Sequence, residues 1–254
     1  MPTIIFNHGA WHTPECWTAV KTALQQQGHR CHAPALDFSN TPQPVESLAS
    51  SINQIQDLIR SETNEGNDVV LVNHSFGGSV GCSAAKGFTQ KNPSRLSPTA
   101  KGKVVGIIQL CAFMPPAKTA LYDVLDMDNS VHHPGPDGWE VIDNGDPEVL
   151  FYNDLPAETA KYWIGRLQRL SSGSLGDREN VYPGWADVPV WYLICTRDQA
   201  IPVKWQEAAV NAAKEAGADI RAEYLDCGHS PFLSRVDETV RFIGGVSETL
   251  KEKV

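Results

Sequence analysis

One serine stands where a buried strand is predicted to turn into a helix. Residues 69–72 form a continuous aliphatic run, which is typical of a parallel strand buried on both faces. Ser75 follows this run, and Gly77 and Gly78 let a helix begin close to the sheet. On such a segment the hydroxyl lies beside the positive end of the helix, where it can act as a nucleophile. An ordinary turn in which Ser75 caps the helix is the alternative.

A serine hydroxyl needs a base to remove its proton and a third group to orient that base. Two later loops supply such groups, because Asp198 follows a predicted strand at 190–195 and His229 follows one at 220–225. The carboxyl ends of parallel strands meet at one edge of a sheet, so we expect both side chains near Ser75. The order serine, acid, histidine is that of one large class of hydrolases.

Each of these residues also has a simpler interpretation. Asp198 alone fits a turn or a helix cap, and His229 alone fits a surface loop. Asp226 is a rival acid, but it lies too near His229 in sequence to reach the far side of its ring. Asp123 and Asp126 are weaker rivals, because the strand before them has no acid directly after it.

Acyl transfer also requires N–H donors aimed at the oxyanion that develops on the substrate. The backbone N–H of Phe76, directly after the serine, is predicted to be one donor. Ala10, in the loop after the first predicted strand, is expected to supply the second. Gly9 allows the backbone to turn close to the substrate, and His8 is expected to be a structural hydrogen-bonding residue.

The composition is that of an ordinary globular chain. Its 254 residues are 41% hydrophobic and 20% charged, which suits one α/β domain with a lid. A net charge of −9 argues against nucleic acid or anionic membranes as partners. The six cysteines are dispersed without metal-type spacing, and the N-terminus lacks the pattern of a secretory signal. We therefore expect reduced thiols, a cytoplasmic location and no metal or organic cofactor.

Strand and helix patterns alternate along most of the chain, which predicts an α/β fold with a mostly parallel central sheet and helices on both faces. Strands are predicted at 3–7, 29–33, 69–72, 104–111, 190–195 and 220–225, and helices at 14–27, 45–62, from 77, at 204–215 and at 236–250. The alternation stops between 116 and 185, where aromatic residues are frequent and helical patterns occur at 120–125 and 157–170. We predict a cap insertion over 116–185 on a core of 1–115 and 186–254.

Together the loop motifs resemble the α/β-hydrolase superfamily. The resemblance is carried by His8-Gly9-Ala10-Trp11, His74-Ser75-Phe76-Gly77-Gly78, Asp198 with Ile201-Pro202, and Gly228-His229-Ser230-Pro231. They look most like the branch that holds plant methylesterases, such as methyl salicylate esterase, and the hydroxynitrile lyases. The resemblance implies an α/β-hydrolase fold with an inserted helical cap, a triad of Ser75, His229 and Asp198, and an oxyanion hole at Ala10 and Phe76. Asn73 departs from the family pattern, because a glycine is usual at this position.

This resemblance implies a serine hydrolase that cleaves an ester or lactone of a small apolar or aromatic metabolite through an acyl-enzyme. Hydroxynitrile lyases of the branch have threonine where Gly9 stands and lysine where Ser230 stands, which favours hydrolysis here. A ligand receptor or a lyase on the same fold are the alternatives. The partner is expected to be a small-molecule substrate, with a homodimer left open. Substrate contacts are predicted at Gly9, Trp11, Phe113, Trp139 and Trp163.

Overall fold

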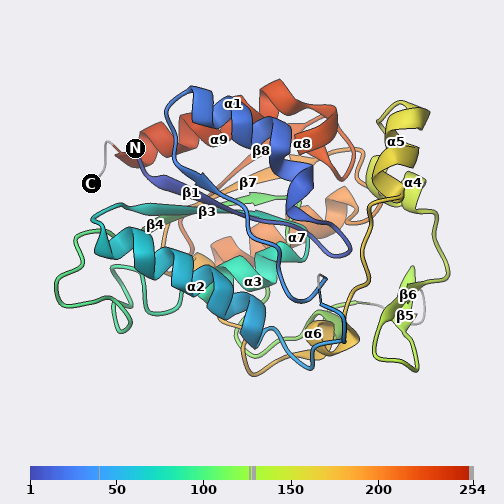
Figure 1. Cartoon of the computed structure of the whole chain (residues 1–254), viewed down its shortest axis with the longest axis horizontal. Helices are drawn as coiled ribbons and strands as arrows, with labels where there is room; N and C mark the ends of the chain where they lie inside the picture. The colour runs from blue at the N-terminus through green and yellow to red at the C-terminus, as the bar shows by residue number, and fades with distance from the viewer. Residues whose placement is uncertain (40, 126, 128–129, 252–254) are drawn as a thin grey trace.

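The computed structural model describes residues 1–39, 41–125, 127 and 130–251, which form one layered α/β structure (Figure 1). Its centre is a parallel sheet of six strands in the order β2-β1-β3-β4-β7-β8. The strands are β1 (Thr3–Asn7), β2 (Cys31–His32), β3 (Val69–His74), β4 (Val104–Leu110), β7 (Val190–Cys195) and β8 (Ile220–Leu225). The strand predictions were therefore close, although the second strand is shorter and the third longer than expected.

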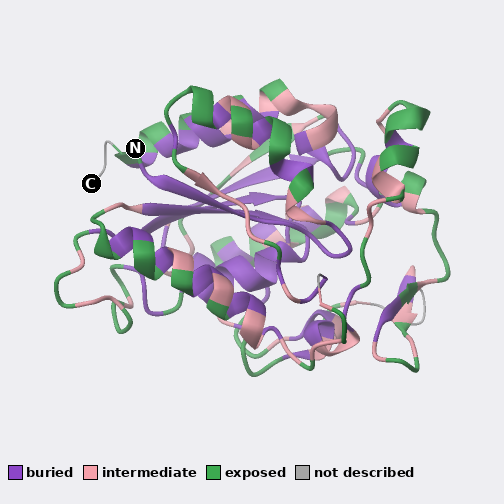
Figure 2. Cartoon of the chain, viewed as in Figure 1, coloured by how far each residue is buried: buried purple, intermediate pink, exposed green. Residues whose placement is uncertain are grey.

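Helices cover both faces of the sheet (Figure 1). One face carries η1 (Pro14–Trp17), α1 (Thr18–Gln26), α8 (Pro231–Ser234) and α9 (Val236–Lys251). The other carries α2 (Ala49–Asn64), α3 (Gly77–Ala84) and α7 (Val203–Glu215). Side chains alternate along β1 between these two layers, so that Phe6 packs with Trp17 while Ile5 joins the core that contains Ile55. Figure 2 shows the central strands buried on both sides, which explains their unbroken aliphatic sequences.

The region between β4 and β7 contains several short elements rather than long helices. They are η2 (Leu121–Asp123), β5 (His132–Pro134), β6 (Glu140–Ile142), α4 (Pro147–Tyr152), α5 (Ala157–Ile164), α6 (Ser172–Gly176) and η4 (Gly184–Ala186). The antiparallel pair β5–β6 differs from the expected all-helical cap, because strands of three residues leave too short a pattern to read. The helix expected over 157–170 ends at Ile164, and the predicted domain boundaries stay a prediction.

Main-chain hydrogen bonds fasten this cap to the core. The N–H of Gln168 donates to the carbonyl of Trp11 over 2.7 Å, and the N–H of Ser171 donates to the carbonyl of Phe38 over 2.9 Å. The hairpin joins the same segment, because the N–H of Glu140 donates to the carbonyl of Leu170 over 2.8 Å. The cap is therefore packed onto the loops at the carboxyl edge of the sheet.

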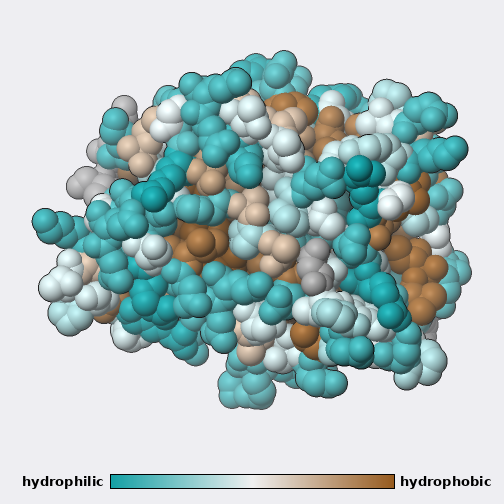
Figure 3. All heavy atoms as spheres, in the orientation of Figure 1, coloured by the Kyte–Doolittle hydropathy of each residue, from teal (hydrophilic) through white to brown (hydrophobic). Residues whose placement is uncertain are grey.

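The surface in Figure 3 is mostly hydrophilic, with apolar atoms showing over the cap strands at the right of the view. Val141 of β6 is 47% exposed and contributes to the apolar surface of the cap. Within the described part of the chain, every helix is too short or too polar to span a bilayer.

Candidate active site

Ser75 occupies a sharp turn between β3 and α3. Its backbone φ is +52°, a left-handed conformation that costs a non-glycine residue roughly 1–3 kcal/mol. The turn is also crowded, because a Cβ at Gly77 would lie 2.5 Å from the carbonyl oxygen of His8. A Cβ at Gly78 would lie 2.1 Å from the carbonyl oxygen of Phe113. The two glycines are therefore required so that the strained serine can be held at the end of the sheet.

Asn73, the departure from the family pattern, is accommodated by a glycine on the next helix. A Cβ at Gly81 would lie only 1.9 Å from Oδ1 of Asn73. The same Oδ1 accepts a hydrogen bond of 2.6 Å from Nδ2 of Asn7, at the end of β1. Asn73 therefore requires a glycine at position 81, and its amide ties β1 to β3 beneath Ser75.

Asp198 and His229 form a buried pair. Nδ1 of His229 lies 2.8 Å from Oδ2 of Asp198, and the two residues are 1% and 3% exposed. The other carboxylate oxygen, Oδ1, accepts the backbone N–H groups of Ala200 and Ile201, each over 2.8 Å. Nε2 of Gln206, on α7, lies 3.3 Å from Oδ2. The carboxylate is therefore held in one orientation, and it fixes the proton of His229 on Nδ1.

The rival acids lie elsewhere. Asp226 is exposed and forms an ion pair of 2.9 Å with Arg197. Asp123 pairs with Arg178 and accepts the N–H of Ala120. Asp126 lies outside the described residues. Asp198 is thus the acid that the described residues bring to His229.

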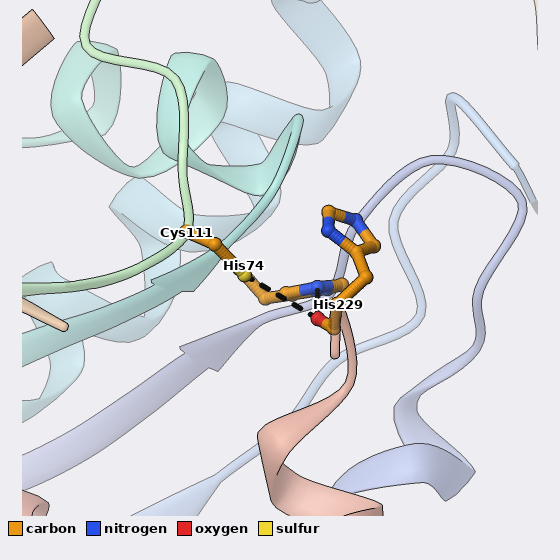
Figure 4. Close-up of side chains that lie close together, drawn as sticks. All are labelled: His74, Cys111 and His229. Atoms are coloured by element: carbon orange, nitrogen blue, oxygen red, sulfur yellow. Dashed lines mark hydrogen bonds between the residues drawn. The ribbon is translucent and has the colours of Figure 1, made fainter. Parts of the chain in front are cut away.

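The loop that carries His229 is positioned through its main-chain carbonyl. Figure 4 shows His74 and Cys111 both directed at this oxygen, with the ring of His229 on its other side. Nε2–H of His74 donates over 2.9 Å and Sγ–H of Cys111 over 3.3 Å. Burial lowers the pKa of His74 well below its usual value and raises that of Cys111 to about 12, so both groups stay neutral donors.

These three side chains also form a group whose candidate ligand atoms lie within 4.8 Å of one another, as a metal site would require. Two of them, His74 and Cys111, are already engaged as donors to the carbonyl of His229. The third, His229, has its Nδ1 on Asp198. The geometry of these residues therefore fits the positioning of His229 better than it fits the coordination of an ion.

The cap also holds both loops of the pair. Oδ2 of Asp154 accepts the N–H of Gly228 over 2.8 Å, next to His229. Nδ2 of Asn153 donates to the carbonyl of Arg197 over 2.8 Å, next to Asp198. A Cβ at Gly228 would lie 2.1 Å from Oδ1 of Asn153, so the close contact depends on glycine. The end of α4 thus bridges the acid loop and the histidine loop.

The two predicted oxyanion donors lie at the same cavity as the serine. The N–H groups of Ala10 and Phe76 have no hydrogen-bond acceptor among the described residues. His12 supports the first loop, because its Nδ1 lies 2.7 Å from the carbonyl of Ala10 and its Nε2 lies 3.2 Å from the hydroxyl of Tyr152. Burial lowers the pKa of His12 to about 3, so this ring is neutral.

A cavity of about 300 Å³ lies above these groups. Its wall includes Ser75 and His229, together with the two predicted oxyanion residues, Ala10 and Phe76. The predicted substrate contacts Trp11 and Phe113 also line it. Most of the remaining wall comes from aliphatic and aromatic side chains of the cap and of the loop before α7. The residues brought to one cavity therefore match a nucleophile, a base and two donors.

A sequence model described as the alpha/beta hydrolase family matches residues 4–242. The chain belongs to this family. Methylesterase 2 of Arabidopsis thaliana is 30% identical over 252 residues, which cover 90% of this chain and 89% of the relative. Alpha/beta hydrolase nvfD of Aspergillus novofumigatus is 26% identical over 245 residues, which cover 95% of each chain. A solved structure of a pyrethroid hydrolase from Sphingobium faniae JZ-2 has the same fold, with a TM-score of 0.77 at 22% identity over 99% of both chains.

The membership confirms the α/β-hydrolase fold and the resemblance read from the loop motifs. Methylesterases of the plant branch are among the matched relatives of this alpha/beta hydrolase. The roles of Ser75, Asp198, His229, Ala10 and Phe76 stay predictions, although the structure brings their atoms to one cavity or, for Asp198, directly behind it.

Three predicted substrate contacts do not line this cavity. Gly9 lies behind the serine, and a Cβ there would stand 2.8 Å from Cβ of Ser75. Trp139 is buried under the guanidinium of Arg169, 4.4 Å from its ring centre. Trp163 lines a separate surface groove beside α1. Aromatic content alone did not show which side of the cap each ring would take.

Sequence reasoning also missed residues that position the site. Gln206 and His12 lie on a helix and a loop whose patterns gave no sign of a polar task. His132 and Glu140 form a buried pair in the cap, and the sequence pattern gave no sign of this pairing. Only for His74, beside the serine in the motif, was a signal present in the sequence.

Proposed function

We propose that this alpha/beta hydrolase cleaves carboxylic esters of small, largely apolar molecules through Ser75, His229 and Asp198. One observation carries the proposal. A buried pair joins Nδ1 of His229 to Asp198 over 2.8 Å, and His229 shares the wall of a cavity with the strained serine and two unpartnered N–H donors. Relatives named as methylesterases, and a structural neighbour named as a pyrethroid hydrolase, support ester cleavage.

In the proposed reaction, Nε2 of His229 takes the proton of Ser75 as its Oγ attacks the ester carbonyl. The N–H groups of Ala10 and Phe76 then stabilise the negative oxygen of the tetrahedral intermediate. When this intermediate collapses, the alcohol leaves with the proton from His229, and the acyl group stays on Ser75. Water, deprotonated by His229, attacks the acyl-enzyme and releases the acid while the proton returns to Ser75.

The wall of the cavity suggests the kind of ester. Leu121, Ile142, Leu150 and Phe151 contribute apolar surface, and the volume of about 300 Å³ suits a small molecule. Lactones are cyclic members of the same class, and the same steps would open them.

The proposal is tested by turnover of p-nitrophenyl acetate with wild type and Ser75→Ala. We expect the variant to lose at least about 10³-fold in kcat, because the other groups retain only part of the catalysis. Ser230→Ala is the matched control, since this buried serine stands next to His229 but its hydroxyl has no partner in the described part of the chain. Equal rates for wild type and Ser75→Ala would overturn the proposal.

A serine-directed phosphonate gives a second readout. We expect it to add one label to wild type and none to Ser75→Ala, as mass spectrometry would show. Turnover that survives complete labelling would instead favour a lyase that forms no acyl-enzyme. Labelling without repeated turnover of any ester would favour a ligand receptor.

A further inference from the structure

A second carboxylate–histidine pair lies in the cap. Nδ1 of His132, on β5, is 2.5 Å from Oε2 of Glu140, on β6. The hydroxyl of Tyr122 donates to the other carboxylate oxygen. The side chain of Glu140 is fully buried and that of His132 is 9% exposed. The proposed reaction uses none of these three residues.

The pair leaves one ring nitrogen available. Burial raises the pKa of Glu140, but hydrogen bonds, among them those from His132 and Tyr122, outweigh it and hold the pKa below its usual value. Glu140 is therefore a carboxylate that accepts the Nδ1–H of His132. Nε2 of His132 has no partner among the described residues, and His132 lines the cavity. This nitrogen therefore has an unmet hydrogen-bonding capacity in a residue that lines the cavity.

Among the described residues no hydrogen bond joins His132 to His229, and each ring has its Nδ1 on its own carboxylate. The ring of Trp11 lies 5.1 Å from that of His132, edge to face, and 5.7 Å from that of Phe151. Phe151 in turn lies 5.8 Å from the ring of His229. The chain of ring contacts from one histidine to the other thus runs through two aromatic residues, and we infer that His132 would meet a part of the substrate away from the reacting carbonyl.

Ser130 adds a donor at the same place. Its Oγ accepts the N–H of His132 over 3.3 Å, and it lines the same cavity. The O–H of Ser130 has no acceptor among the residues that the structure describes. A residue with an acceptor nitrogen and one with a hydroxyl donor, two positions apart in the chain, therefore both line a cavity whose wall is otherwise mainly apolar.

We propose that His132 and Ser130 form a subsite for a hydroxyl group, and that preferred substrates are esters with an alcohol or phenol group remote from the scissile carbonyl. A hydroxyl fits either form of His132, because it can donate to the neutral Nε2 or accept from a protonated one. An ester without it covers Nε2 of His132 with apolar groups and leaves this nitrogen unpaired, which lowers kcat/KM by about tenfold. This inference rests on the proposed ester hydrolysis.

The test uses p-nitrophenyl esters of straight-chain acids of increasing length, each with and without a terminal hydroxyl. In wild type, the ratio of kcat/KM for the hydroxylated and plain esters should reach a maximum of about tenfold at the length that reaches His132. The double variant His132→Phe/Glu140→Gln should flatten this maximum. The double change avoids a buried carboxylate without its donor. Ser130→Ala should lower the maximum by a smaller factor.

His133→Phe is the matched control. This neighbour on β5 is more exposed, pairs with Asp143 over 2.9 Å and does not line the cavity. The His133→Phe variant should keep the maximum in the kcat/KM ratio. If this variant also lost the maximum, the fold of the hairpin rather than the subsite would explain the effect, and the inference would be overturned. A flat ratio in wild type, with hydrolysis that still requires Ser75, would overturn the subsite and leave the proposed function intact.

Failure of the proposed function itself has a separate outcome. If no ester is turned over through Ser75, calorimetric binding of phenol and toluene to wild type and to the double variant tests the subsite directly. A selective loss of phenol binding supports it, and an equal change for both overturns it.

Discussion

Core and cap each hold an imidazole by its Nδ1 on a buried carboxylate, but they do so on different supports. In the core, His229 and Asp198 come from loops after adjacent parallel strands, β8 and β7. In the cap, His132 and Glu140 stand on a hairpin with strands of three residues. The sheet fixes where its loops must meet, whereas the hairpin takes its position from contacts at residues 168–171.

The difference shows what each region can contribute. A loop at the carboxyl edge of a six-stranded sheet is rigid enough to hold reacting groups in place. A short hairpin with few hydrogen bonds of its own is better suited to shaping the cavity above them. The following predictions test this division, beginning with the largest expected effect.

The carboxylate of the core pair should matter most. Asp198→Asn keeps the shape of the side chain but favours the wrong tautomer of His229, so kcat should fall by about 10⁴-fold. Asp226→Asn is the matched control, because this exposed acid pairs with Arg197 and Thr196, neither of which lines the cavity. Steady-state turnover of p-nitrophenyl acetate measures both. Equal losses would show that the core loop is not held as described.

Gly81 should be the most sensitive packing position under the serine turn. Gly81→Ala places a methyl group against Oδ1 of Asn73, and we expect unfolding to become easier by about 1–3 kcal/mol. The double variant Asn73→Ala/Gly81→Ala should lose less than the sum of the single changes. Urea denaturation measures all three. Strict additivity would contradict the direct contact between the two positions.

Two tryptophans distinguish the cavity wall from the outer surface of the cap. Trp11→Ala should raise KM for apolar esters by about tenfold, because it removes a large apolar surface from the cavity. Trp163→Ala should leave KM within about twofold, since Trp163 lines a surface groove instead. The reverse order would place the substrate on the other side of α5.

Low pH should destabilise the core around Glu62 and the cap around Glu140 independently. Burial raises the pKa of Glu62, but hydrogen bonds from His32, Thr3 and Asn67 outweigh it and lower that pKa, as also happens at Glu140. A carboxyl group whose pKa is lowered by folding stabilises the fold at pH values above its pKa in the unfolded chain. This contribution is lost as the pH falls through its pKa in the folded protein.

We therefore expect Glu62→Gln to reduce the acid-dependent loss of unfolding free energy by about 1 kcal/mol. In the cap, Glu140→Gln should change the onset of limited proteolysis with falling pH more than it changes global unfolding. Denaturant titrations and proteolysis across acidic pH measure these effects. Identical pH profiles for wild type and both variants would show that neither carboxylate is charged in the way described.

The core was predictable because its signals are local and repeated. Buried strands are marked by aliphatic runs, and each functional residue follows the end of such a run, as Ser75, Asp198 and His229 do. The sequence indicated that Asn73 is larger than the usual residue at its position. That Gly81 makes room for its side chain became visible only from the distance between β3 and α3. Gln206 could not be found, since its carboxylate partner comes from a loop that folds back on the helix.

The cap was predictable only as a composition. Its aromatic residues indicated a cover over the sheet, and Trp11 and Phe113, which adjoin core strands, lie in the cavity wall. Trp139 and Trp163 turn elsewhere, because short elements allow many orientations and neighbouring contacts decide among them. His132 and Glu140 lie eight residues apart, and only the pairing of β5 with β6 brings them together.

The amino-acid sequence alone determined the α/β-hydrolase fold and the order of its chemistry-bearing loops, because strand periodicity and glycine-bearing turns are written locally. Tertiary structure alone decided which rings enclose the cavity, which groups hold the histidine loop, and that a second imidazole, that of His132, lines the same cavity. Those arrangements depend on packing between segments far apart in the chain, and no short stretch of residues encodes a distance across that gap.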